Sequence, residues 1–271
     1  MKLFTKKELL ERIAKIGSAL PEKVTVYMIG GCAMSLRGEK EATKDVDWIV
    51  DSAEEMRLMA KTLKVLGFFE AVALPKEYVN LGTAAVLKDM GGFQCDLFLK
   101  KVCNALVLSD GMKRRATPYG DFGKLAVHLL SDEDIFLFKG MTERERDLED
   151  MLTILRRGLD YRIVLDECAK QRSDSGIWEA FLVEKLGEME KRYGISLPWK
   201  KALMKTAENV MMESIILSKI REGGRTVKDL ASALRYSQSV IRSELAKLEK
   251  NGLIKVDRSK RCFEFGVDEI K

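Results

Sequence analysis

Two apolar segments joined by a glycine pair and a charged turn constrain the fold of this chain more than any other feature. The first segment, residues 24–29, runs into Gly30-Gly31. The second, residues 45–50, carries Asp45 and Asp47. Side chains two residues apart in an extended strand share a face, so the two aspartates project together. Neighbouring carboxylates repel each other unless a cation neutralises them. The pattern therefore predicts a strand, a glycine turn, a short helix and a second strand that holds a cation.

The same stretch predicts a phosphate site next to the cation. A glycine pair ahead of a helix leaves backbone N–H groups unobstructed at the positive end of that helix, where a phosphate can sit. Carboxylate oxygens suit Mg²⁺, which usually takes one or two of them together with substrate phosphates. Taken separately, a glycine pair is usually a turn, and an Asp-x-Asp is usually a solvated strand end. Their combination at this spacing favours a metal and phosphate site.

These residues carry a family resemblance. Gly30-Gly31, the short helix after it and Thr43-Lys44-Asp45-Val46-Asp47 resemble the signature of the nucleotidyltransferase superfamily typified by DNA polymerase beta. The small prokaryotic nucleotidyltransferases of abortive-infection and toxin–antitoxin type are the more similar group. The resemblance covers residues 20–155. In that family the second glycine is often serine, whereas this chain has Gly31. The resemblance implies an α+β fold with a mixed sheet and flanking helices.

The resemblance also implies roles for individual residues. It calls for a third carboxylate on a neighbouring strand, and the best match is Asp96 in the apolar segment 93–99. The catalytic residues, which would also hold Mg²⁺ or Mn²⁺, are then Asp45, Asp47 and Asp96. The residues that would bind the phosphates of a nucleoside triphosphate such as ATP are Gly30, Gly31, Ser35 and Lys139. For Lys139 the alternative is a structural role, because the segment after it is rich in Arg and Asp and can be laced by ion pairs.

Cysteine and histidine usage excludes several other chemistries. The five cysteines are scattered without C-x-x-C spacing, so neither a disulfide framework nor a zinc site is expected. The single histidine, His128, lies in an apolar segment, which excludes a catalytic His dyad. No apolar run has the length of a membrane span, and residues 1–20 follow the pattern of an amphipathic helix, not of a signal peptide. We therefore expect a cytoplasmic protein with no membrane partner.

The positive charge of the chain is concentrated in its last quarter. The formal net charge is +5, and residues 200–271 hold 16 Lys and Arg against 10 Asp and Glu. A local excess of this kind points to contact with a polyanion.

Residues 205–268 resemble a winged helix-turn-helix domain. Helical patterns at 208–221, 227–234 and 238–251 are followed by two apolar strands around the basic turn 257–261. In such domains the second helix of the motif enters the major groove by its N-terminal half. The candidates for nucleic-acid contact are Gln238, Ser239, Arg242 and Ser243 on that helix, and Arg258, Lys260 and Arg261 at the tip of the wing. Such domains also mediate protein contacts, so a homodimer is the alternative use of this unit.

Three units and two classes of function follow from these patterns. The predicted units are a nucleotidyltransferase core (1–128), a helical subdomain (129–204) and a winged helix-turn-helix (205–271). The leading hypothesis is a metal-dependent transferase that moves a nucleoside monophosphate from a triphosphate to an acceptor and releases pyrophosphate. Nucleic acid and small molecules such as an aminoglycoside stay open as acceptors. The alternative is a DNA-binding transcriptional regulator whose nucleotidyltransferase-like domain senses a nucleotide or only dimerises.

Overall fold

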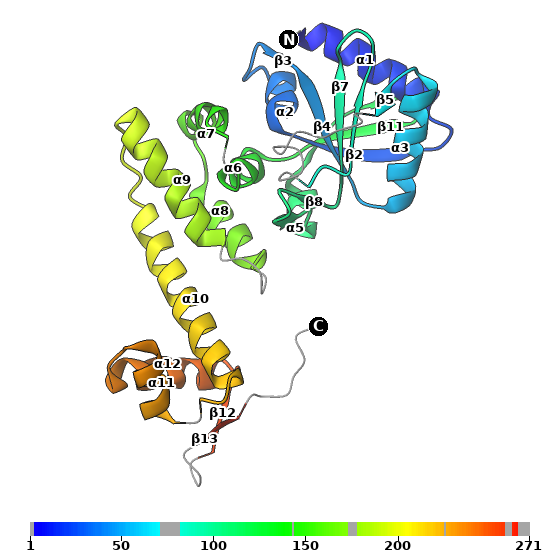
Figure 1. Cartoon of the computed structure of the whole chain (residues 1–271). Coiled ribbons are helices and arrows are strands. Elements are labelled where there is room, and N and C mark those ends of the chain that lie inside the picture. The colour runs from blue at the N-terminus through cyan, green and yellow to red at the C-terminus, as the bar shows by residue number, and fades with distance from the viewer. Residues whose placement is uncertain are drawn as a thin grey trace. The chain divides into compact units, whose positions relative to one another are not determined.

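The chain divides into two compact units, Met1–Lys200 and Lys201–Lys271. The computed structural model describes residues 3–70, 82–142, 144–172, 178–224, 226–257 and 262–264 (Figure 1). Within these ranges no helix combines the length and the apolarity that crossing a membrane requires. A further division at residue 128, into a core and a helical subdomain, stays a prediction.

A mixed sheet organises the first unit. Its described strands are β2 (Val24–Ile29), β4 (Asp45–Val50), β5 (Phe69–Glu70), β6 (Ala85–Lys88), β7 (Gln94–Leu99), β10 (Thr117–Phe122) and β11 (Leu125–Leu129). They follow the order β10-β11-β2-β4-β7-β6-β5. β2 runs parallel to β11 and antiparallel to β4, and β4 runs parallel to β7. Two short pairs lie outside this sheet: β1 (Phe4–Thr5) with β3 (Ala42–Thr43), and β8 (Lys101–Val102) with β9 (Leu106–Val107).

The apolar segments form the central strands because helices and neighbouring strands cover them. In β4, the side chains of Val46 and Trp48 are completely buried. Among the helices that pack against the sheet are α1 (Lys6–Ala19), α2 (Gly30–Arg37) and α3 (Ala53–Val65). Thr5 and Ser52 are the N-caps of α1 and α3, and each accepts a hydrogen bond from a first-turn N–H group. The mixed α+β architecture that the sequence predicts is therefore present.

Helices complete the first unit. They are α5 (Asp110–Arg115), α6 (Asp132–Gly140), α7 (Arg146–Arg156), α8 (Tyr161–Lys170) and α9 (Trp178–Tyr193). α6 contacts α7, α8 and α9 and is buried from Asp134 to its end. Arg115 Nη2 lies 2.6 Å from Asp134 Oδ1 and 2.6 Å from Glu167 Oε2. Because both carboxylates are buried, this arginine ties α5 to α6 and α8 through ion pairs.

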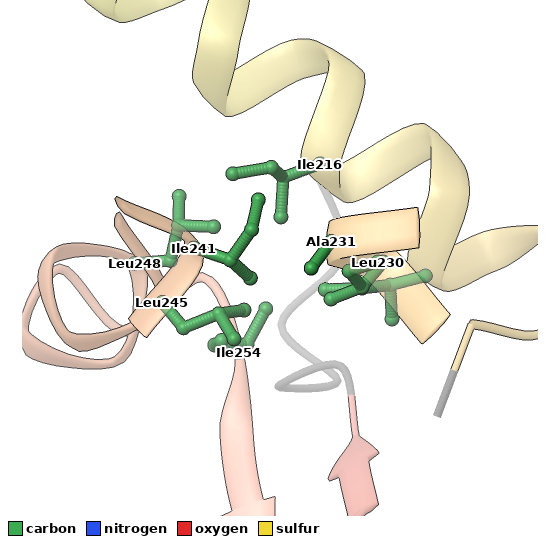
Figure 2. Close-up of a cluster of buried hydrophobic side chains, with 8 residues drawn as sticks. Ile216, Leu230, Ala231, Ile241, Leu245, Leu248 and Ile254 are labelled. Carbon is green, nitrogen blue, oxygen red and sulfur yellow. The ribbon is translucent and has the colours of Figure 1, made fainter. Parts of the chain in front are cut away.

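The second unit has the helices and the hairpin of a winged helix-turn-helix. Its elements are α10 (Lys200–Arg221), α11 (Val227–Leu234), α12 (Gln238–Lys250), β12 (Lys255–Asp257) and β13 (Cys262–Glu264). Thr226 and Ser237 cap α11 and α12, and Arg235 ends α11 in the left-handed region at φ 58°. Figure 2 shows the core that joins α10, α11, α12 and the start of the hairpin. Its buried side chains are Ile216, Ile220, Leu230, Ala231, Ile241, Leu245, Leu248 and Ile254.

Candidate functional site

The three predicted carboxylates lie next to one another on the two central strands. The register between β4 and β7 pairs Asp47 with Asp96 and Asp45 with Gln94. Paired residues of neighbouring strands point to the same face, so Asp45, Asp47 and Asp96 share one face of the sheet. Asp96 is 1% exposed. Its Oδ1 accepts a hydrogen bond of 2.7 Å from Gln94 Nε2. The tertiary fold thus brings Asp96, distant in sequence, beside the Asp-x-Asp pair.

Burial and repulsion by neighbouring carboxylates disfavour the charged forms of Asp47 and Asp96. Burial, followed by the charge of Asp45, raises the pKa of Asp47 to about 7. Burial also raises the pKa of Asp96 well above the ordinary Asp value, and the charges of Asp47 and Asp45 add to that rise. A nearby cation would lower both pKa values, because it stabilises the ionised forms. The site is therefore electrostatically suited to a positive ligand.

A pocket of about 250 Å³ opens beside Asp45 and Asp47. The glycine pair lines it, as do basic side chains and two further aspartates. These charged lining residues are Lys40, Lys44, Lys139, Arg144, Arg146, Asp147 and Asp150. A recess of about 30 Å³, lined mostly by apolar side chains, shares Gly30, Asp47, Lys139 and Arg144 with this pocket. All of these described lining residues belong to the first unit.

Gly30 and Gly31 begin α2 directly beside Asp47. Gly30 has a φ of +65°, and a Cβ at this position would lie 2.5 Å from Asp47 Oδ2, so this position requires glycine. A Cβ on Gly31 would lie 3.4 Å from Thr43 Oγ1, which leaves room for a small side chain. Among the described residues, no side chain caps the N-terminus of α2. Its first N–H groups are therefore available to a phosphate.

Cys32 fixes the backbone next to Asp47. Its Sγ donates a hydrogen bond of 2.9 Å to the Ile29 carbonyl oxygen and accepts one of 3.4 Å from the Asp47 N–H. Burial, followed by the charge of Asp47, raises the pKa of this thiol well above its ordinary value. The neutral thiol is therefore a buried link between the start of α2 and β4.

Lys139 is buried and held by two carboxylates. Its Nζ lies 2.9 Å from Asp147 Oδ1 and 2.6 Å from Asp150 Oδ2. Arg144 Nε lies 2.8 Å from the other oxygen of Asp147, and Lys40 Nζ lies 2.9 Å from Asp150 Oδ1. Burial lowers the pKa of Lys139, but Asp147 and Asp150 outweigh it, so the pKa is raised. Burial likewise works against ionised Asp147, but Lys139 and Arg144 outweigh it and hold the pKa of Asp147 well below its ordinary range.

The contacts of Lys139 match the alternative, structural role, in which ion pairs join the helix that carries Lys139 to the helix after it. Its side chain nevertheless lines the pocket, so the predicted contact with nucleotide phosphates stays a prediction. Sequence reasoning missed the parts that Lys40, Lys44 and Asp150 play in the pocket. The spacing of Asp147 and Asp150, three residues apart on one helix face, was the available signal. Nothing in the sequence connects Lys40 with Asp150.

Ser35 and Asp96 lie outside the lining of the pocket. Ser35 is 1% exposed inside α2, and its Oγ has no hydrogen-bond partner within the described part of the chain. The structure therefore places Gly30, Gly31 and Lys139 at the pocket, but not Ser35. Asp96 is next to Asp47 in the sheet, but Asp45 and Asp47 are the two that face the pocket.

The carboxylates fit a metal ion that substrate helps to hold. Among the described residues, no three side chains of His, Cys, Asp or Glu are grouped so that they would hold a metal ion by themselves. Mg²⁺ usually takes one or two carboxylates and completes its shell with water and phosphate oxygens. Asp45 and Asp47 match that requirement, because both line the pocket next to the free N–H groups of α2.

The second candidate site is the exposed face of α12. The four side chains predicted to contact nucleic acid, Gln238, Ser239, Arg242 and Ser243, are all exposed. Arg242 Nη2 donates a hydrogen bond of 3.1 Å to Gln238 Oε1. Ser239 Oγ lies 2.8 Å from Oγ of the capping residue Ser237. The core side chains of α12 point to the opposite side, toward α10 and the hairpin (Figure 2). The predicted wing contacts, Arg258, Lys260 and Arg261, lie outside the described residues.

Comparison with known families bears on this second site. Residues 214–256 match the family model described as bacterial regulatory protein, arsR family. The C-terminal unit carries an arsR-type helix-turn-helix. The match runs from α10 through α12 into β12, and it supports DNA binding by this unit. No curated protein matches the chain.

Proposed function

We propose that the first unit is a metal-dependent nucleotidyltransferase and that the second unit binds nucleic acid. One observation carries the enzymatic part: Asp45 and Asp47 stand beside the uncapped N-terminus of α2, in a pocket that also holds several basic side chains. Paired carboxylates suit a divalent cation, and the helix terminus suits a phosphate. A metal-bound nucleoside triphosphate supplies both ligands at once.

The proposed reaction assigns a part to each group of residues. A bound Mg²⁺ or Mn²⁺ would polarise the phosphate under attack and stabilise the charge that develops on it. Asp45 and Asp47 would hold the metal, and the N–H groups of Gly30 and Gly31 would orient the phosphate chain. An acceptor hydroxyl oxygen bonds to the α-phosphorus while the bond from that phosphorus to the bridging oxygen of pyrophosphate breaks. Asp96, next to Asp47 in the sheet, would accept the hydroxyl proton once the bound cation has lowered its raised pKa and ionised it.

The second unit would place its recognition helix in the major groove of DNA. Gln238, Ser239, Arg242 and Ser243 lie in the N-terminal half of α12, the part that reads base edges in helix-turn-helix proteins. Arg favours guanine edges and Gln favours adenine edges. The family match and the exposure of these four side chains support this role.

A second candidate function is a DNA-binding regulator without transferase activity. The match to a bacterial regulatory family favours it. The ion pairs that Lys139 makes with Asp147 and Asp150 also favour it, because they give this lysine a structural role without any substrate. In this case the pocket would sense a nucleotide or serve only in dimerisation, and the sequence-specific DNA complex would be the functional state.

Calorimetry with each of the four nucleoside triphosphates, with and without Mg²⁺, tests the proposal before the acceptor is known. The native protein should bind a triphosphate only with the metal, and Asp45→Asn should lose that binding. Asp121→Asn is the matched control, because Asp121 is an exposed aspartate on β10 outside the pocket. Metal-dependent binding would justify a screen of oligonucleotides and small hydroxyl compounds for transfer of a labelled nucleotide. A well-folded native protein that binds no triphosphate would contradict the transferase and favour the regulator.

A further inference from the structure

The basic side chains that line the pocket differ in whether they have a partner. Lys139 is paired with both Asp147 and Asp150, Arg144 is paired with Asp147, and Lys40 is paired with Asp150. Lys44 Nζ lies 3.5 Å from Asp45 Oδ2. Each of these four cations therefore already has a carboxylate of the pocket as its partner.

Arg146 is the exception. Its side chain lines the same pocket and is exposed. Within the described ranges it has neither an ion pair nor a side-chain hydrogen bond, and the aspartates nearby are already shared among other cations. Arg146 is thus the one basic lining residue, among those that the structure describes, whose positive charge is uncommitted.

The backbone of Arg146 is nevertheless held in a fixed place. Arg146 is the first residue of α7, and the next residue, Asp147, is 1% exposed and bonded to Lys139, Thr142 and Arg144. A fixed backbone lowers the entropy lost when the guanidinium binds an anion, because only the side chain has to be ordered.

We propose that Arg146 binds the terminal phosphates of the nucleotide and makes the pocket select triphosphates over monophosphates. This rests on the proposed nucleotide site. The phosphate nearest the reacting bond would be bound by the N-terminus of α2 and, through the metal, by Asp45 and Asp47. A triphosphate carries further negative charge beyond that point, and the paired lysines are already neutralised. The planar guanidinium offers two parallel N–H donors to a phosphate, a geometry that lysine cannot reproduce.

The test is calorimetry on the full chain with Mg²⁺, comparing ATP, ADP, AMP and inorganic tripolyphosphate. If another base binds better, its tri-, di- and monophosphates replace the adenine series. Arg146→Gln should weaken triphosphate and tripolyphosphate binding by roughly tenfold, the diphosphate less, and the monophosphate not at all. Arg146→Lys should restore only part of the loss. The matched control is Arg156→Gln, which removes the same charge from an exposed arginine at the other end of α7.

The possible outcomes separate this inference from the proposed function. Native protein that binds triphosphate equally well after Arg146→Gln would overturn the role of Arg146 and leave the transferase proposal intact. An equal loss for ATP, ADP and AMP would also overturn it, because the residue would then act on the nucleoside or on the whole fold. If Arg156→Gln lost as much triphosphate binding as Arg146→Gln, the effect would come from net charge alone, and the role of Arg146 would be overturned. Native protein that binds none of the four ligands would overturn the proposed nucleotide site and this inference with it.

Discussion

The pocket of the first unit and the recognition face of the second unit use charge in opposite ways. In the pocket, Lys139, Asp147 and Asp150 are buried and bonded to one another. On α12, Arg242 and Gln238 are exposed and share a single hydrogen bond. Buried charges must find partners within the protein, whereas exposed charges are solvated and free to meet an external one. Substitutions in the first region should therefore change stability and ligand binding together, and those in the second should change binding alone.

The largest effect is expected from Asp47→Asn. It should lower metal-dependent nucleotide transfer by at least roughly 100-fold, because the substitution removes a proposed metal ligand and keeps the shape of the side chain. The fold should survive, since the change also removes a repelling buried charge. Transfer of a labelled nucleotide and a thermal melt together check this. Full activity in the variant would exclude Asp47 as a metal ligand.

Lys139→Met should be strongly destabilising. It leaves Asp147 and Asp150 buried beside a missing cation, which typically costs about 3–5 kcal/mol. The difference in unfolding free energy can be measured in urea. Lys170→Met is the comparison: Lys170 forms an exposed pair with Asp166, so its loss should stay within about 1 kcal/mol. Similar small losses in both variants would show that the pocket network does not stabilise the fold.

The metal-free protein should lose stability as the pH rises from about 4 to about 7. The pKa of Asp47 is raised to about 7 in the folded state, so the folded protein holds a proton there that the unfolded chain has already released. The slope should not exceed about 1.4 kcal/mol per pH unit for this one group. Urea unfolding at pH 5 and pH 7.5 measures it. Asp47→Asn should flatten the slope, and an unchanged slope would assign the titration to other groups.

Arg242→Ala should weaken specific DNA binding by roughly tenfold and leave the unfolding transition unchanged, because this side chain is exposed. The preferred sequence can be selected from a random duplex pool and its affinity measured by fluorescence anisotropy at fixed salt. Arg156→Ala, on an exposed position of the first unit, controls for net charge. An equal loss in both variants would mean that Arg242 contributes only general electrostatic attraction.

The two glycines at the start of α2 give a contrast between neighbouring positions. Gly30→Ala should destabilise the protein by about 1–3 kcal/mol, since a Cβ there meets Asp47 in a left-handed backbone conformation. Gly31→Ser should change stability by less than about 1 kcal/mol, because the nearest side-chain atom is 3.4 Å from the added Cβ. Thermal melts of the two variants compare them directly. Equal sensitivity would show that the second position is as constrained as the first.

Local sequence patterns predicted the elements of both regions better than their long-range contacts. The apolar strand with two aspartates, the glycine that opens α2 and the core spacing of α12 depend on residues close in sequence. Asp96 was expected on a strand beside the Asp-x-Asp pair because the family resemblance calls for a third carboxylate there, and β7 does pair Asp96 with Asp47. The contact of Lys40 with Asp150 joins residues far apart on the chain, and no periodic pattern in the sequence predicts a contact of this kind.

Ser35 illustrates a second limit of prediction from the sequence. Its place in the short helix after the glycine pair gave it the right distance in sequence from the phosphate site. The side chain instead faces the interior, as its 1% exposure shows. Which side of an eight-residue helix faces the sheet depends on packing against β2, β3 and β4, and its nearly continuous apolar sequence does not specify that side.

The buried thiol of Cys32 offers a way to follow the pocket by chemical labelling. A disulfide reagent in solution can reach its Sγ only when α2 and β4 part, because the thiol is bonded to the backbone of both segments. The rate of its labelling therefore reports how often the site opens in the native protein. A ligand that bridges the glycine turn and Asp47 would hold these segments together. Slower labelling of the Cys32 thiol would therefore show that a ligand is bound in the pocket, even when the reaction is unknown.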